Sequence, residues 1–325
     1  ENTVLAQPET TDNQCQSDQF IVSGGTPVPA LCGTLTGSHS KPLFIISSPL
    51  TLSLIYPAFS DIDMGLDNNN PIVLTVVTSG ASFERSFNIK ISQIECNSLS
   101  KGELLLSINA KLKIYLYTAS DGCLQYFTGV SGQMFSFNYN NAAGLQLSNT
   151  DYTMCVRMER NFCGIQYTAC PDEANTPPQA FSVTGGSPTL GSVVGTSVRL
   201  ALKNVVGVYL TIYPGITDWI TIPCATNTND PTTQSGIPVV CVDRICGQVF
   251  NSVTTPNTDP NVPVYSYSKP FNIYVHTDSL EGSSSPAESS NRSGKKLNTH
   301  CVNESLCSRG FCINYVQQPC TSGAG

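Results

Sequence analysis

The apolar residues of this chain fall mostly into short runs in which they alternate with polar residues. The clearest runs are Tyr152 to Arg157 and Cys163 to Tyr167, which are joined by a charged turn. A third run, Met134 to Tyr139, is richer in aromatic residues and follows a turn at residues 128–131. Such alternation is typical of half-buried strands, in which one face packs and the other meets water. The pattern therefore predicts a protein built from β-strands.

Similar runs lie before and after this stretch. In the first part of the chain, the expected strands are residues 18–22, 50–56, 72–78 and 87–96. Two apolar runs, Leu104 to Ile108 and Leu112 to Tyr117, predict a hairpin that either packs between domains or serves as an arm for a partner protein. Residues 279–300 are hydrophilic and rich in serine, which predicts a loop.

The second half of the chain repeats the layout of residues 15–96. Four segments match earlier ones in order: residues 218–223 match 18–22, 243–247 match 32–33, 270–275 match 49–54, and 310–320 match the strand that ends at Cys96. An internal repeat of this kind indicates two homologous modules.

Composition narrows the class of protein. With 325 residues, the chain is long enough for two domains of about 150 residues each. Its net charge of −7 argues against a nucleic-acid binder, and the densest basic cluster, residues 292–296, is expected to be a solvated loop. Fourteen dispersed cysteines indicate disulfides formed in an oxidising compartment. The chain begins with Glu1 and lacks an apolar leader, so we expect a processed, secreted, extracellular protein.

The stretch that begins with CLQYFTG at Cys123 resembles the opening half of a CUB domain. It continues with an SFNY-like strand and a hairpin of the form YxxCxRxExxxCxIxY, and it is closest to tandem-CUB proteins secreted by arthropods. The positions of that last pattern are Tyr152, Cys155, Arg157, Glu159, Cys163, Ile165 and Tyr167. The resemblance implies an all-β, disulfide-rich fold of two antiparallel β-sandwich modules, each a CUB-like jelly roll.

The resemblance also divides the chain. Residues 1–96 correspond only to the closing half of a module, 97–122 form a connector, 123–320 form a complete module, and 321–325 form a tail. Half a sandwich would expose an apolar face and unpaired strand edges. We therefore expect the missing half to come from outside, either as a cleaved upstream fragment or as strands of a neighbouring molecule, unless the sequence simply begins late. The tail fits a lipid-anchor site or a frayed end, and membrane contact is expected only for the anchor.

Cysteine pairs follow from the same resemblance. The closing half of a CUB domain begins with a bonded cysteine pair, which implies Cys15–Cys32. We further expect Cys96–Cys123 and Cys155–Cys163, and the pattern assigns no pairs to the other eight cysteines. Their spacing lacks the tight CxxC knuckles of zinc sites.

Many CUB domains bind calcium through a glutamate and two aspartates. Asp218 and Asp278 match the two aspartates in the second module, and Asp18 with Asp61 or Asp63 would match them in the first. The run 181–217, where the glutamate would stand, contains no acidic residue. Asp218 and Asp278 therefore either bind calcium or are surface or turn carboxylates, and no other cofactor is expected. Asn291 and Asn303 begin N-glycosylation sequons.

No reactive constellation accompanies these features. The three histidines show no HExxH pattern, and the chain has no GxSxG elbow and no phosphate-binding glycine loop. We therefore expect no enzyme activity. The leading hypothesis is a secreted structural or assembly protein whose modules contact other protein chains, including copies of itself. The alternative is an extracellular module that binds a glycan or a secreted protein with help from calcium. A regulatory part of a secreted protease is a third reading.

Overall fold

The computed structural model consists of β-strands and a single short 3-10 turn, Asn140–Ala142, within the part of the chain that it describes. The described residues are 3–9, 12–25, 27–35, 59–60, 71–79, 82–87, 89, 91, 122–172, 180–183, 193–195, 218–229, 241–247, 249–252, 262–279 and 308–320. The predicted all-β fold with antiparallel sheets is confirmed.

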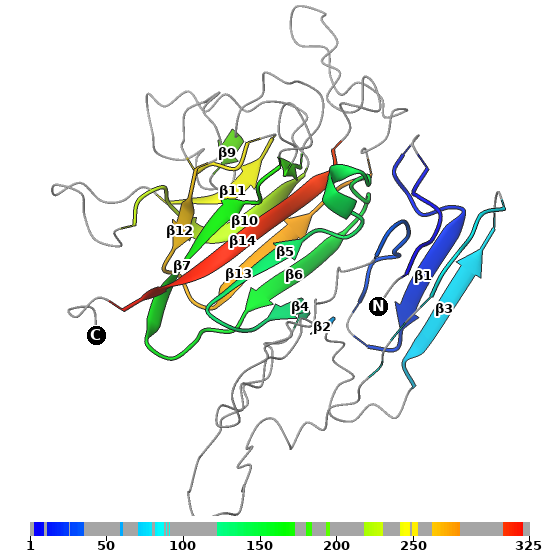
Figure 1. The fold of residues 1–325 in the computed structure, drawn as a ribbon, viewed down its shortest axis with the longest axis horizontal. Coiled ribbons are helices and arrows are strands. Elements are labelled where there is room, and N and C mark those ends of the chain that lie inside the picture. The colour runs from blue at the N-terminus through cyan, green and yellow to red at the C-terminus, as the bar shows by residue number, and fades with distance from the viewer. Residues whose placement is uncertain are drawn as a thin grey trace, which may run out of the picture.

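Two sheets face each other in a sandwich (Figure 1). The larger sheet contains, in spatial order, β2 (Phe59–Ser60), β4 (Cys123–Phe127), β6 (Asp151–Val156), β13 (Phe271–His276), β10 (Trp219–Ala225), β11 (Val242–Cys246) and β9 (Val193–Gly195). The other contains β12 (Val264–Ser266), β7 (Phe162–Ala169), β14 (Gly310–Pro319) and β5 (Ser131–Phe135), with β8 (Phe181–Ser182) paired to β14. All pairs are antiparallel except β4 with β6.

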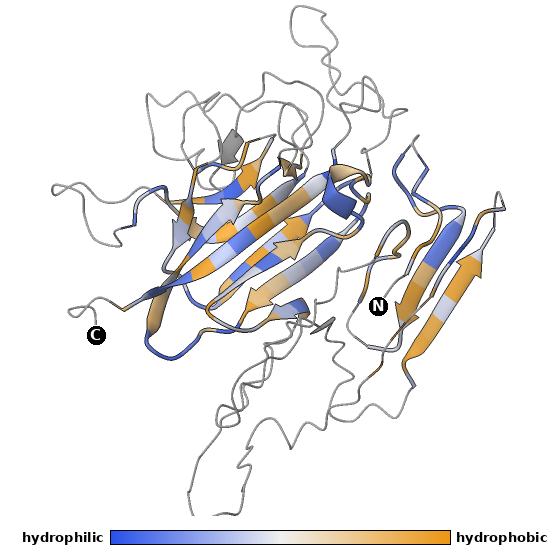
Figure 2. Ribbon diagram, viewed as in Figure 1, coloured by the Kyte–Doolittle hydropathy of each residue, from blue (hydrophilic) through white to orange (hydrophobic). Residues whose placement is uncertain are grey.

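The core lies between these sheets, and several strands, β6, β7, β10 and β13 among them, contribute apolar side chains at alternate positions. This alternation is visible as bands of apolar and polar residues along the strands in Figure 2. The inward side chains, all at most 8% exposed, include Tyr152, Met154, Val156, Ile165, Tyr167, Ile220, Ile222, Phe271, Ile273, Val275, Ile313 and Tyr315. Each such side chain stabilises the fold by about 1.5–3 kcal/mol through burial.

The strands predicted at 152–157 and 163–167 are present as β6 and β7, but they do not form the expected hairpin. β6 pairs with β13 and β4, whereas β7 pairs with β14 and β12 in the opposite sheet. The connection between β6 and β7 therefore passes from one sheet of the sandwich to the other. Gln317 holds it there, because its amide donates to the carbonyl of Arg157 and accepts from the N–H of Glu159.

The aromatic run Met134 to Tyr139 is also not one strand. β5 ends at Phe135, and the chain then turns through Asn138, whose φ is 59°. A left-handed residue breaks the extended ladder, and asparagine is one of the few residues that adopt this conformation readily.

Two of the three predicted disulfides are wrong. Cys123 bonds with Cys155, since β4 and β6 are sheet neighbours, and Cys163 bonds with Cys320 just beyond β14. These bonds exclude Cys96–Cys123 and Cys155–Cys163. Among the described residues, the sandwich also contains the disulfides Cys170–Cys312 and Cys224–Cys241. Cys96 lies outside the described residues.

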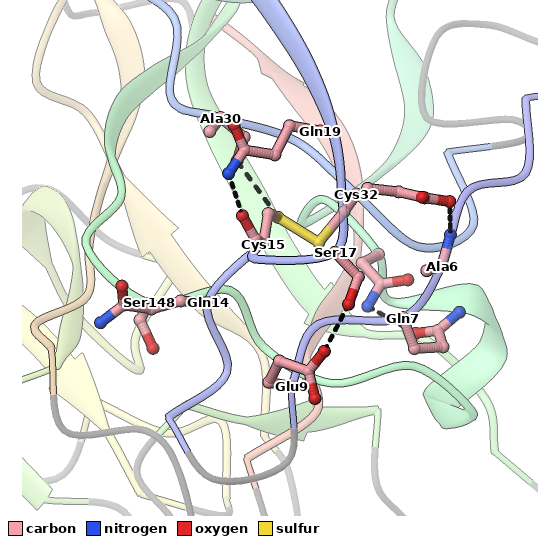
Figure 3. The surroundings of a disulfide bond; sticks show 12 residues. Ala6, Gln7, Glu9, Gln14, Cys15, Ser17, Gln19, Ala30, Cys32 and Ser148 are labelled. Atoms are coloured by element: carbon pink, nitrogen blue, oxygen red, sulfur yellow. Dashed lines mark hydrogen bonds between the residues drawn. A yellow bond between two sulfur atoms is a disulfide. The ribbon is translucent and has the colours of Figure 1, made fainter. Parts of the chain in front are cut away.

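The N-terminal part forms a small sheet of its own, beside the sandwich in Figure 1. β1 (Asp18–Ser23) pairs antiparallel with β3 (Val73–Thr78), and Phe20 of β1 bridges to Leu31 on its other side. Cys15 bonds with Cys32, in agreement with the expected pair, and Figure 3 shows this bond beside the Ser17–Glu9 hydrogen bond. The disulfide therefore ties the start of β1 to the returning chain.

The strand pairing in the small sheet is like that of two strands in the sandwich, with one difference from the match expected from the sequence. β1 pairs with β3 as β10 pairs with β13, so residues 73–78 take the place that was expected for 49–54. The predicted strand at 50–56, the hairpin within 97–122 and the loop at 280–300 lie outside the described residues.

Candidate functional site

The N-terminal segment docks onto the sandwich through Asn138. The side-chain oxygen of Asn138 accepts the N–H of Thr34 at 2.8 Å, and its amide donates to Gln7 Oε1 at 2.9 Å and to the carbonyl of Leu145 at 3.0 Å. Asn138 is fully buried. Gly33 lies so close that an added Cβ would be 2.1 Å from Asn138 Oδ1. The turn after β5 is therefore a specific receptor for the segment that contains Gly33.

A second contact lies on the loop before β6. The N–H of Ser148 donates to the carbonyl of Asn13 at 3.1 Å, and its hydroxyl donates to the carbonyl of Asp12. Apolar contact accompanies these bonds, because one core cluster joins the sandwich to the N-terminal residues Leu5, Leu31, Cys32 and Leu35. The two parts share a continuous core.

A saturated carboxylate stands at the start of β1. Both oxygens of Asp18 accept from Arg85, at 2.7 and 3.0 Å, and they also accept the N–H groups of Ala6 and Ser79. The hydrogen bond from Arg85 is the main cause that holds the pKa of Asp18 below its ordinary value, while burial acts in the opposite direction. Arg85 thus balances this buried charge, and the four acceptor sites of the carboxylate are occupied.

The two residues expected to bind calcium are near each other but differ in environment. Asp218 is fully buried, directly before β10, and its Oδ1 accepts the backbone N–H of Asp278 at 3.0 Å. Burial, and then the charge of Asp218, raises the pKa of the Cys246 thiol to about 12, with Arg244 acting in the opposite direction. Within the described ranges, no three His, Cys, Asp or Glu side chains are grouped as metal ligands. Calcium binding by Asp218 and Asp278 stays a prediction of the resemblance.

A row of polar and aromatic side chains crosses the solvent-facing side of the larger sheet. The Arg244 guanidinium lies 4.3 Å from the ring centre of Trp219, which stacks at 4.3 Å on the ring of His276. Nδ1 of His276 lies 2.5 Å from a carboxylate oxygen of Asp151. We call Asp151, His276, Trp219 and Arg244 the cross-strand row. Tryptophan and arginine together on an accessible surface are typical of binding sites.

The small sheet exposes a surface of another kind. Apolar side chains that are at least 39% exposed occur along β3 and in the residues that follow it: Val73, Val76, Val77, Phe83, Phe87, Ile89 and Ile91. We call them the N-terminal apolar surface. Figure 2 shows β3 as a mostly apolar strand on the outer side of the small sheet. Val76 lies on the opposite face of β3 from Val73 and Val77, so apolar side chains are exposed on both faces of this strand. Exposed apolar side chains in this number commonly mark a contact with another molecule.

The sequence did not identify several of these residues. Asn138 falls within a predicted strand, and no sequence motif surrounds Arg85. The cross-strand row is formed by residues from four strands, so it can be recognised only when the strand register is known. The clustered asparagines at 138–141 are a turn signal that could have located the docking loop. Asn291 and Asn303 lie outside the described residues, so their glycosylation stays a prediction. No helix long and apolar enough to span a membrane occurs among the residues described.

Comparison with known proteins identifies the family. The family model for the animal CUB domain matches residues 120–318. No curated protein matches the chain. Two solved structures are similar at 11% identity and a TM-score of 0.24: the CUB1-EGF-CUB2 domains of rat MASP-1, where the match covers 97% of this chain and 86% of that one, and the CUB1-EGF-CUB2 domain of human MASP-1/3, with 97% and 87%. Since the family match spans more than half of its residues, this chain belongs to the animal CUB domain family.

Proposed function

We propose that this chain is a secreted, non-enzymatic assembly protein that acts through contacts with other protein chains. CUB domains mediate protein–protein interactions in extracellular proteins and are generally non-catalytic binding modules. The observation that carries the proposal is the N-terminal apolar surface, which stays exposed although β1, the strand that pairs with β3, packs on the core of the sandwich through Phe20. A sheet that is held firmly in place and exposes apolar side chains is suited to permanent contact with a partner.

We further propose that, within the CUB family, this chain is related to the tandem-CUB proteins secreted by arthropods. This relationship is supported by the sequence CLQYFTG from Cys123 and by the pattern from Tyr152 to Tyr167. Disulfides on both modules support an oxidising, extracellular location. A cleaved upstream fragment, a second copy and an unrelated secreted protein are all partners that this function allows.

Native mass spectrometry of the purified chain, with and without reductant, tests the proposal. We expect masses above one glycosylated chain, and a loss of these species when Phe87, Ile89 and Ile91 are all replaced by serine. Met158→Ser is the matched control, because Met158 is a comparably exposed apolar residue, 46%, on the sandwich turn. A single-chain mass at every concentration, together with no association with any co-secreted protein, would refute the proposed function.

A second candidate function is recognition of a glycan or secreted protein by the cross-strand row. Its aromatic ring and guanidinium are half-buried and are held on neighbouring strands rather than on a loop. We expect Trp219→Ala to abolish such binding on a glycan array or in a pull-down while the melting temperature changes little. Equal binding by wild type and Trp219→Ala would exclude the row as the site.

A further inference from the structure

We propose that the outer edge of β3 accepts an antiparallel strand from a second polypeptide, in the register in which β6 pairs with β13. The inference rests on the proposed function and deepens it, since it names the contact and the chemistry of the partner. In the sandwich, β6 covers the edge of β13 that is equivalent to the outer edge of β3.

The registers of the two modules coincide. In the small sheet, Asp18 is opposite Thr78 and Phe20 is opposite Val76. In the second module, Ile220 is opposite Val275, and Asp218 directly precedes β10. Val76 therefore corresponds to Val275, and Leu74 corresponds to Ile273. The two aspartates also make the same hydrogen bond: the N–H of Ser79 donates to Asp18, and the N–H of Asp278 donates to Asp218.

Backbone hydrogen bonds show which groups of β3 face outward. The N–H of Ser79 donates to the carbonyl of Ser17, and hydrogen-bonded pairs alternate along an antiparallel ladder. The bonded pairs to β1 are thus those of Val77 and Thr75. The N–H and carbonyl groups of Leu74, Val76 and Thr78 then point away from β1. Within the described residues, no strand pairs with this edge.

The second module uses the corresponding groups to bind β6. The N–H of Thr277 donates to the carbonyl of Thr150, so the pairs that exchange bonds include Val275 with Tyr152 and Ile273 with Met154. The backbone groups of β13 that bond to β6 therefore correspond to the groups of β3 that no described strand pairs with.

Side-chain burial gives the same result. Ile273 and Val275 are 0% and 5% exposed because both sheets and β6 surround them. Val76, the counterpart of Val275, is 39% exposed. The sequence of β3, VLTVVT, contains no charge and no proline, which are the usual protections of an edge strand. The edge is therefore able to pair, and pairing would cover apolar surface.

The partner strand has a defined chemistry. β6 places Tyr152, Met154 and Val156 on the core side, opposite Val275, Ile273 and Phe271. By analogy, the partner is an extended segment with apolar side chains at alternate positions, as in the opening half of a CUB module. A second copy of this chain has its own β6 paired on both sides, so it does not offer this strand.

The test uses a fluorescent peptide that copies Thr150 to Arg157 with Cys155→Ser, added to the full chain and followed by anisotropy. We expect saturable binding that weakens at least about tenfold in Val76→Pro, because proline removes an outward N–H without breaking a bond to β1. Val77→Thr, on the opposite face and with its N–H already bonded to β1, is the matched control and is expected to bind as wild type. A scrambled peptide is expected not to bind.

Hydrogen exchange provides a readout that is independent of the proline variant. Bound peptide is expected to slow exchange at Leu74, Val76 and Thr78, while Thr75 and Val77 change little. Absence of binding up to about 1 mM peptide, or equal binding by Val76→Pro, overturns the inference. If native masses still show association that Val76→Pro does not affect, the assembly function stands and the edge is not its contact. A dimer of the chain alone that Val76→Pro dissolves would place a second copy at the edge and would also overturn the proposed occupant.

Discussion

Replacement of Asn138 by alanine should release the N-terminal segment from the sandwich. The change removes three hydrogen bonds and leaves the N–H of Thr34 and the carbonyl of Leu145 without this partner. Leaving a buried polar group without its partner lowers the free energy of unfolding by about 1–3 kcal/mol. The lost bond to Gln7 adds little to this loss, because the Gln7 side chain is exposed and can bond to water. Alanine at a φ of 59° adds about 1 kcal/mol. We expect a total loss of about 3–5 kcal/mol, with no change in the sandwich sheets.

Three companion variants separate these contributions. Asn138→Gly relieves the backbone strain but loses all three bonds, so it should recover only about 1 kcal/mol relative to alanine. Asn138→Asp retains the acceptor for Thr34 but brings a carboxylate oxygen against the carbonyl of Leu145, and it should be at least as destabilising as alanine at neutral pH. Gly33→Ala should reproduce the effect with Asn138 intact, because its Cβ would clash with that side chain.

Urea denaturation and hydrogen exchange measure the effect. The unfolding midpoint should fall, and the amide of Thr34 should exchange faster in Asn138→Ala while the amides of β6 and β13 stay protected. If the unfolding midpoint and the exchange rate of the Thr34 amide are both unchanged, Asn138 does not hold the N-terminal segment on the sandwich, and the proposed role of this side chain is refuted.

Other expected outcomes follow from single features of the fold. Asp18→Asn should cost about 2–3 kcal/mol at neutral pH, below the range for a fully buried pair since Arg85 is partly exposed. Because the folded pKa of Asp18 is lowered, its stabilisation is present above the ordinary value of about 3.8 and is lost as the pH falls further, so acid unfolding should become less steep in the variant. Burial raises the pKa of Tyr139 to about 12, so its stabilisation is present below pH 10 and is lost between pH 10 and 12, where tyrosinate absorbance and melting temperature should change together. Peptide mapping without reduction should link Cys163 to Cys320. Treatment with an N-glycosidase should lower the mass of the secreted chain if either sequon carries a glycan.

Alternation of apolar and polar residues predicted the strands well but not their partners. β6 and β7 were located within two residues at each end, because each buries one face. Alternation is the same for a hairpin and for a connection that crosses between sheets, since both strands face one core. The cysteine errors have the same origin. Cys155 is closer in sequence to Cys163, but its neighbour in space is set by the pairing of β4 with β6.

The candidate sites were harder to predict because their residues are distant in sequence. Asp18 and Arg85 are separated by 67 positions, and Asn138 and Thr34 by 104. The repeat was recognisable from Asp18 and Asp218, which stand at the starts of matching strands. The sequence predicts that residues 49–54 match β13, whereas the structure places β3, residues 73–78, in the equivalent position. Several apolar runs in this region fit the pattern equally well, so the sequence does not distinguish between them.

The two matching aspartates show why the repeat transfers fold more reliably than function. Both are buried, and both accept a backbone N–H from just beyond the paired strand: that of Ser79, directly after β3, and that of Asp278, two residues after β13. In the first module the carboxylate is bonded to Arg85 and two backbone N–H groups, so its acceptor sites are filled and a calcium ion would have to displace the arginine. The hydrogen bond that both modules share fixes the strand register, and residues outside the repeat decide what else each carboxylate does. An aspartate at this position therefore identifies the fold of a module, whereas its ligand has to be established separately for each module.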